Sequence, residues 1–104
     1  MVPMNHFPEG LVDAVRIWAG WGIMPAPNRS EARLKSRYGE GRGAELLLLI
    51  KSLEADFYSS TAHLAAKDLK EMATVSFAEF RGRHPEMPPE VAEVFAWCYT
   101  FDYR

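Results

Sequence analysis

The chain has one cysteine, no long apolar run and almost no net charge, and each shortage excludes a class of protein. Cys98 alone cannot form an intramolecular disulfide, and with three scattered histidines it does not supply a zinc ligand set. No apolar run approaches the roughly 20 residues that cross a bilayer, and the first residues lack the pattern of a signal peptide. We therefore expect a cytoplasmic protein with no membrane partner, metal or cofactor.

The net charge of −2 argues against a protein that coats nucleic acid through bulk positive charge. The charges are nevertheless unevenly distributed. Five bases and two acids lie between residues 29 and 42, whereas four acids and one base lie from residue 86 onward. A basic segment and an acidic end predict different partners. The bases of the segment are Arg29, Arg33, Lys35, Arg37 and Arg42.

Alternating apolar and polar residues, the signal of a β-strand, do not occur over a useful length, whereas helical spacing recurs along the chain. The 104 residues, of which 48% are hydrophobic, suit one domain spanning residues 1–104. We predict an all-α, compact single domain of about five short helices. The expected helices cover residues 8–19, 44–58, 61–72, 77–83 and 89 onward, and residues 23–43 are expected to form a basic, loop-rich linker that could include a short helix capped by Ser30.

A candidate helix-turn-helix lies within residues 60–84. Ala65 supplies the small residue where two helices cross, Ala73–Val75 is the expected turn, and Ser76 would cap the second helix. Leu69 occupies the place usually held by glycine in the turn, so other amphipathic helix pairs fit the same pattern. Together with the basic segment, this motif predicts nucleic-acid contacts from Lys67, Lys70, Ser76, Arg81 and Arg83.

Catalytic motifs are weak in this chain. The glycines at 39, 41 and 43 follow no strand and lack the lysine and hydroxyl residue of a phosphate-binding loop, which favours a linker. Cys98 lies on the apolar stripe of the last expected helix, where packing explains it better than nucleophilic chemistry. The sequence predicts no catalytic residue and no enzyme.

The segment Trp18-Ala19-Gly20-Trp21-Gly22 places two closely spaced tryptophans and glycines at the end of an amphipathic helix. With the basic segment and helical body that follow, it resembles the small Q-type antitermination proteins of lambdoid phages and related bacterial regulators. The resemblance implies a transcription regulator that binds a double-stranded DNA element and bacterial RNA polymerase and allows terminators to be passed. It leaves direct contact with nascent RNA open.

The alternative is a non-enzymatic protein-interaction module, such as an antitoxin, an inhibitor or an assembly factor. Aromatic residues are enriched at interface hot spots, and several lie at the helix ends or off the main apolar stripe. The sequence leaves a homo-oligomer open. The predicted partner-contacting residues are Trp18, Trp21, Trp97, Tyr99 and Tyr103.

Overall fold

The computed structural model describes residues 10–104, and the expected start of the first helix at residues 8 and 9 lies outside them. The chain forms helices in this part and no strand. Five helices have eight residues or more, and one has a single turn. They are α1 (Leu11–Ala19), α2 (Glu31–Tyr38), α3 (Glu40–Phe57), α4 (Ala62–Ala65), α5 (Leu69–Arg83) and α6 (Pro89–Asp102). The predicted all-α fold is confirmed.

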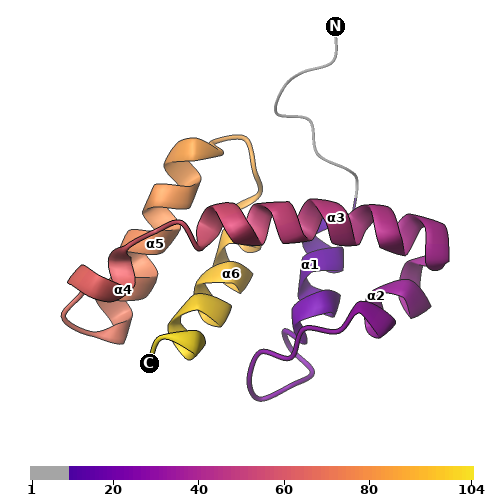
Figure 1. Ribbon diagram of the computed structural model, residues 1–104, viewed down its shortest axis with the longest axis horizontal. Helices are drawn as coiled ribbons and strands as arrows, with labels where there is room; N and C mark the ends of the chain where they lie inside the picture. Colours follow the sequence, from indigo (N-terminus) through magenta and orange to yellow (C-terminus); the bar gives the residue numbers. More distant parts are fainter. Residues whose placement is uncertain (1–9) are drawn as a thin grey trace, which may run out of the picture.

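Helix α3 runs across the molecule (Figure 1). Helices α1 and α2 lie beneath one half of it, and α4, α5 and α6 lie toward the other half. Helix α2 packs on α3, α5 packs on α6, and α1 packs mainly on α6. The first and last helices of the described chain are therefore neighbours.

The segment at residues 23–43 contains α2, the short helix that the sequence allowed after Ser30, but the central helix α3 begins at Glu40 and not at the expected residue 44. Ser30 caps α2 as the sequence indicated: its hydroxyl accepts a hydrogen bond from the Arg33 amide at 3.1 Å. Gly39 then reverses the chain with φ 88°, a value that favours glycine, and α3 begins at the next residue. Glycine here separates two helices without a linker.

The turn expected at Ala73–Val75 is also absent, because these residues lie inside α5. The N-cap of α5 is Asp68, whose carboxylate accepts a hydrogen bond from the Glu71 amide at 2.7 Å. Ser76 therefore caps no helix, and its hydroxyl donates to the Met72 carbonyl at 2.7 Å within the core. The helix-turn-helix predicted at residues 60–84 does not have the expected turn.

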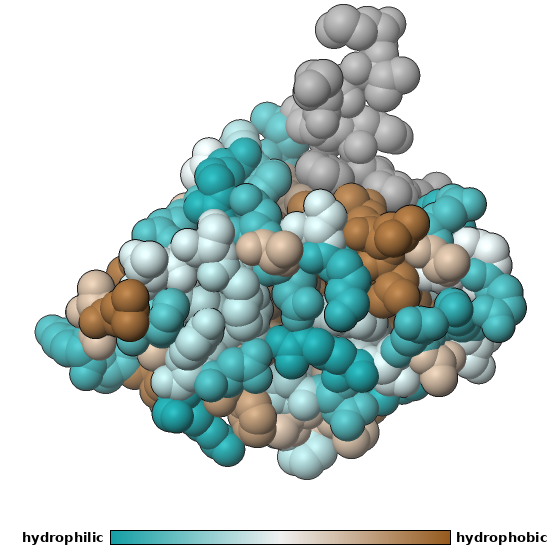
Figure 2. Space-filling model, viewed as in Figure 1, coloured by the Kyte–Doolittle hydropathy of each residue, from teal (hydrophilic) through white to brown (hydrophobic). Residues whose placement is uncertain are grey.

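A single aromatic-rich core joins the helices. Phe57 of α3 lies within 6 Å, between ring centroids, of three buried aromatic rings from α5 and α6: Phe80, Phe95 and Tyr99. The predicted inward faces of α1 and α6 are largely confirmed, since Leu11, Val15 and Trp18 are buried, as are Val91, Val94, Phe95 and Cys98. The face seen in Figure 2 is mostly hydrophilic, with hydrophobic atoms gathered in separate patches.

Gly43 is where α2 and α3 approach most closely. A Cβ atom built at Gly43 would lie 2.9 Å from both the Cα and the Cγ of Lys35, whereas one built at Gly41 meets nothing within 4 Å. We expect Gly43→Ala to lower the free energy of unfolding by about 1–3 kcal/mol, because the helices must separate. The matched control Gly41→Ala should be stabilising by about 0.5–1 kcal/mol, as expected for alanine in an exposed helical position. Urea denaturation of both variants tests the contact, and equal effects would contradict it.

Candidate functional site

An open groove of about 510 Å³ runs between α5 and α6. We call it the α5–α6 groove. Its lining is mainly apolar, and most of the side chains come from one face of each helix. The lining residues are Trp21, Ala73, Thr74, Phe77, Ala78, Glu93, Ala96, Trp97 and Thr100.

Two tryptophans from distant parts of the chain meet at this groove. The Trp21 and Trp97 rings pack edge to face, with centroids 5.2 Å apart and planes at 88°. Trp21 reaches this position because Gly20 ends α1 with φ 82°, and the Trp21 amide donates to the Arg16 carbonyl at 3.0 Å. The tryptophan-glycine segment noted in the sequence therefore turns α1 toward α6, and both rings stay partly exposed.

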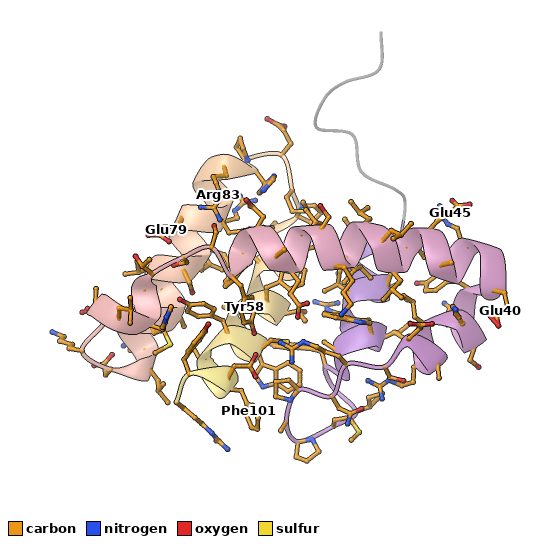
Figure 3. The ribbon with its side chains drawn as sticks, in the orientation of Figure 1. Glu40, Glu45, Tyr58, Glu79, Arg83 and Phe101 are labelled. Atoms are coloured by element: carbon orange, nitrogen blue, oxygen red, sulfur yellow. The ribbon has the colours of Figure 1, made fainter. Side chains whose placement is uncertain are left out.

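A second hollow of about 290 Å³ adjoins the groove and shares Trp97 and Thr100 with it. We call it the Phe101 hollow. Phe101 lies at the foot of α6, at the lower edge of the molecule in Figure 3. The remaining lining residues are Pro25, Ala26, Leu69 and Arg104. The two hollows form one continuous surface along α6.

The charges on this surface stand at its two ends. Glu93 lines the α5–α6 groove, and Arg104 lines the Phe101 hollow; both residues are exposed. Arg104 lies two residues beyond the end of α6, and its guanidinium lies 4.3 Å from the centroid of the Phe101 ring, so it lines the same hollow as Trp97 and Thr100. The surface is thus acidic at one end, apolar in the middle and basic at the other.

The bases predicted to contact nucleic acid are mostly engaged within the chain, and Arg29 shows this best. Its Nε donates to Glu54 at 2.5 Å, and its Nη2 donates to Tyr58 at 2.8 Å and to Asp102 at 2.9 Å. Tyr58, which Figure 3 labels between α3 and α6, in turn donates to Asp102 at 2.6 Å. We call these four residues the Arg29 cluster.

The Arg29 cluster also shifts the protonation of its members. Burial alone lowers the pKa of Arg29, but the hydrogen bonds to Glu54 and Asp102 outweigh it and hold the pKa above its usual value. Burial, followed by the hydrogen bond to Asp102, raises the pKa of Tyr58. At neutral pH the guanidinium is therefore charged and the phenol is protonated, as the observed hydrogen bonds require.

Three further bases of the segment have partners in their own chain. Arg33 donates to the carbonyl groups of Ile17 at 2.9 Å and Trp18 at 3.1 Å, which satisfies the end of α1. Lys35 pairs with Glu31 at 2.8 Å and Glu40 at 3.4 Å, and Arg42 pairs with Glu45 at 3.5 Å. Only Arg37 of the five is exposed with no such ion pair in the described chain, and it lies 5.2 Å from the Tyr38 ring centroid.

The bases of α5 divide into two groups. Arg81 donates to the Met87 carbonyl, and Arg83 pairs with Asp56 at 3.0 Å. Asp56 also accepts from His84 at 2.7 Å; burial raises the pKa of this carboxyl, but the hydrogen bonds from His84 and Arg83 lower it overall. Lys67, before α5, and Lys70, in its first turn, are exposed. These lysines, with Arg37, are the predicted nucleic-acid residues best placed to meet a partner.

Three predicted site residues belong to the core instead. Trp18 and Tyr99 were predicted to contact a protein partner and Ser76 a nucleic acid, yet each is at most 1% exposed. The Tyr99 hydroxyl donates to the Ser60 carbonyl at 2.8 Å and lies 2.7 Å from Nδ1 of His63. Trp21 and Trp97 lie at the α5–α6 groove, and Tyr103 is 41% exposed.

The single cysteine and the histidines lie in different surroundings. Cys98 is buried in α6, and burial, the largest influence, raises the pKa of its thiol to about 12. His63 stacks on Tyr103 with ring centroids 3.9 Å apart, whereas His84 pairs with Asp56. His6 lies outside the described residues. Within residues 10–104, no group of three potential metal ligands lies together.

Sequence reasoning missed several residues of this surface. None of Glu93, Ala96, Phe101 and Arg104 is among the residues predicted to contact a partner. One signal could have found some of them: Glu93, Trp97 and Thr100 are spaced by four and three residues, which places them on one face of α6, and Arg104 follows four residues later, just beyond its end.

Comparison of the chain with protein-family models, with curated proteins and with solved structures finds no match. None of the helices in the described part of the chain has the length and apolar character needed to cross a membrane. Inference about function therefore depends on the surface and its chemistry.

We expect Arg29→Met to lower the free energy of unfolding by about 2 kcal/mol, because Glu54 and Asp102 would lose their cation in a partly buried position. The control Arg37→Met, at an exposed base, should change stability by less than about 0.5 kcal/mol. Chemical denaturation of both variants measures the difference. Equal values would mean that the Arg29 cluster does not hold the fold together.

Proposed function

We propose that this protein is a non-enzymatic protein-interaction module that docks an apolar helix of its partner on the α5–α6 groove. The observation that carries the proposal is the groove itself, whose apolar walls and two tryptophans remain accessible after the chain has folded. A helix laid in a hydrophobic groove is a recurrent mode of protein recognition.

The shape of the surface favours a helix over a small ligand. A small-molecule site encloses most of its ligand, whereas the α5–α6 groove is open and continues into the Phe101 hollow. The continuous surface follows the face of α6 from Glu93 to Arg104. An elongated partner with several apolar side chains on one face fits this form.

The aromatic side chains suit such an interface. Tryptophan is enriched among the residues that dominate binding energy, and Trp21 and Trp97 hold each other in place. Trp97 lines both hollows, so it lies at the centre of the surface, where hot spots concentrate. The engagement of Arg29, Arg33, Lys35 and Arg83 within the chain also supports a partner recognised mainly through apolar contact.

Site-specific photocrosslinking tests this proposal. A photoreactive phenylalanine analogue in place of Ala78, an exposed groove residue, should crosslink to a defined protein in the cells that naturally express this chain. The same analogue in place of Ala55, exposed on α3, is the matched control and should give no such product. Equal crosslinking at the two positions, or none at Ala78, would rule out the groove as the docking site.

The transcription regulator that resembles Q-type antiterminators stays a prediction, and Arg37, Lys67 and Lys70 are its best-placed residues. If they contact phosphates, replacing all three by alanine should reduce the slope of log affinity for duplex DNA against log salt by about 2–3. Lys51→Ala, at an exposed base of α3, is the control. An unchanged slope would exclude these three residues as phosphate contacts, and no salt-sensitive binding by the wild type would remove DNA from the function. A pull-down of bacterial RNA polymerase with the purified protein tests the second predicted partner.

A further inference from the structure

We infer that the helix docked on the α5–α6 groove is α6 of a second copy of this chain, placed antiparallel to the first. The inference rests on the proposed function and names its partner. It follows from the order of the side chains by which α6 and the residues just after it line the two hollows.

The groove-lining residues of α6, with Arg104 two residues beyond its end, are arranged symmetrically in the sequence. Trp97 and Thr100 are equally distant from the midpoint between residues 98 and 99, and so are Ala96 and Phe101. Glu93 and Arg104 are again equally distant from this point. All six residues line the two adjoining hollows.

Two antiparallel copies of a helix related by a two-fold axis place such residues opposite one another. Trp97 would face Thr100 of the second copy, and Ala96 would face Phe101. In each case a large side chain meets a smaller one, as packing between helices requires. Phe101 of the second copy would then enter the α5–α6 groove beside Ala96, and the symmetry would repeat this contact on the other side.

The charges match the same register. Glu93 of each copy would face Arg104 of the other, so two acid–base pairs would close the ends of the apolar contact. A parallel arrangement would instead place Glu93 against Glu93 and Arg104 against Arg104, which like-charge repulsion disfavours. The spacing of 93, 97, 100 and 104 also equals that of the apolar seam of a coiled coil.

Phe101 and Arg104 are already positioned for this contact. The guanidinium of Arg104 lies against the Phe101 ring, and both residues line the hollow next to Trp97. Glu93 forms no ion pair within residues 10–104. The acid can therefore take a base from another molecule without breaking a contact in its own chain.

Charge reversal gives a sharp test, measured by sedimentation velocity over a concentration series. The wild type should dimerise, whereas Glu93→Arg and Arg104→Glu should each raise the dimer dissociation constant by about tenfold or more, because each homodimer would hold two like-charge contacts. An equimolar mixture of the two variants should dimerise again, since both contacts in the mixed pair are then opposite in charge. The double variant should also dimerise.

Glu45→Arg is the control, because Glu45 lies at the far end of α3, over α2 (Figure 3), and should leave the dimer unchanged. Circular dichroism should show the same helical content in all variants, since both reversed residues are exposed. A monomeric wild type would overturn the inference, and so would dimers insensitive to either reversal or single variants that fail to combine. The proposed function would survive each of these results if the analogue at position 78 crosslinks a different protein, and it would fail if that position crosslinks nothing.

Discussion

The interaction on which the fold most depends is the contact of one guanidinium with three helical segments. Arg29 lies in the connection that follows α1, against the indole of Trp18, and its donors reach Glu54 in α3 and Asp102 in α6. Charge-assisted hydrogen bonds are among the stronger polar contacts in proteins. The Arg29 cluster thereby helps to set the position of α6 relative to α3. Because α6 forms one wall of the α5–α6 groove, the cluster also affects where that wall lies.

This use of charge determines what the surface can offer. Four of the five bases between residues 29 and 42 pair with carboxylates or carbonyl groups of the same chain. A base that binds its own fold is held in place and partly neutralised, so it attracts an external phosphate less strongly. The outward feature that remains along α6 is apolar, with one acid and one base at its ends. Because most bases are paired within the chain, the groove offers a partner mainly apolar contacts.

Helical periodicity predicted the fold class and the buried faces of α1 and α6, because both helices have a regular apolar stripe. It failed at Gly39–Gly43 and at Ala73–Val75. Glycines usually indicate a linker, but Gly43 lies inside a helix because α2 passes too close for a side chain. Ser76 suggested a cap, yet its hydroxyl is satisfied within its own helix by Met72, a bond that no sequence pattern distinguishes from capping. The groove could not be predicted because it depends on how α5 lies beside α6 and on where Gly20 directs Trp21.

The pairing of α1 and Arg29 with α6 has a consequence for the order of folding. The bond between Arg29 and Asp102 joins residues 73 positions apart, and Trp18 packs edge to face on Phe95 with ring centroids 6.4 Å apart. Contacts of such high sequence separation form only after the intervening chain is available, which slows folding relative to a bundle closed by local contacts. During synthesis, Trp18 and Phe57 keep part of their apolar surface exposed until α6 has left the ribosome. The core of the nascent chain is therefore incomplete, and open to aggregation, until α6 has been synthesised.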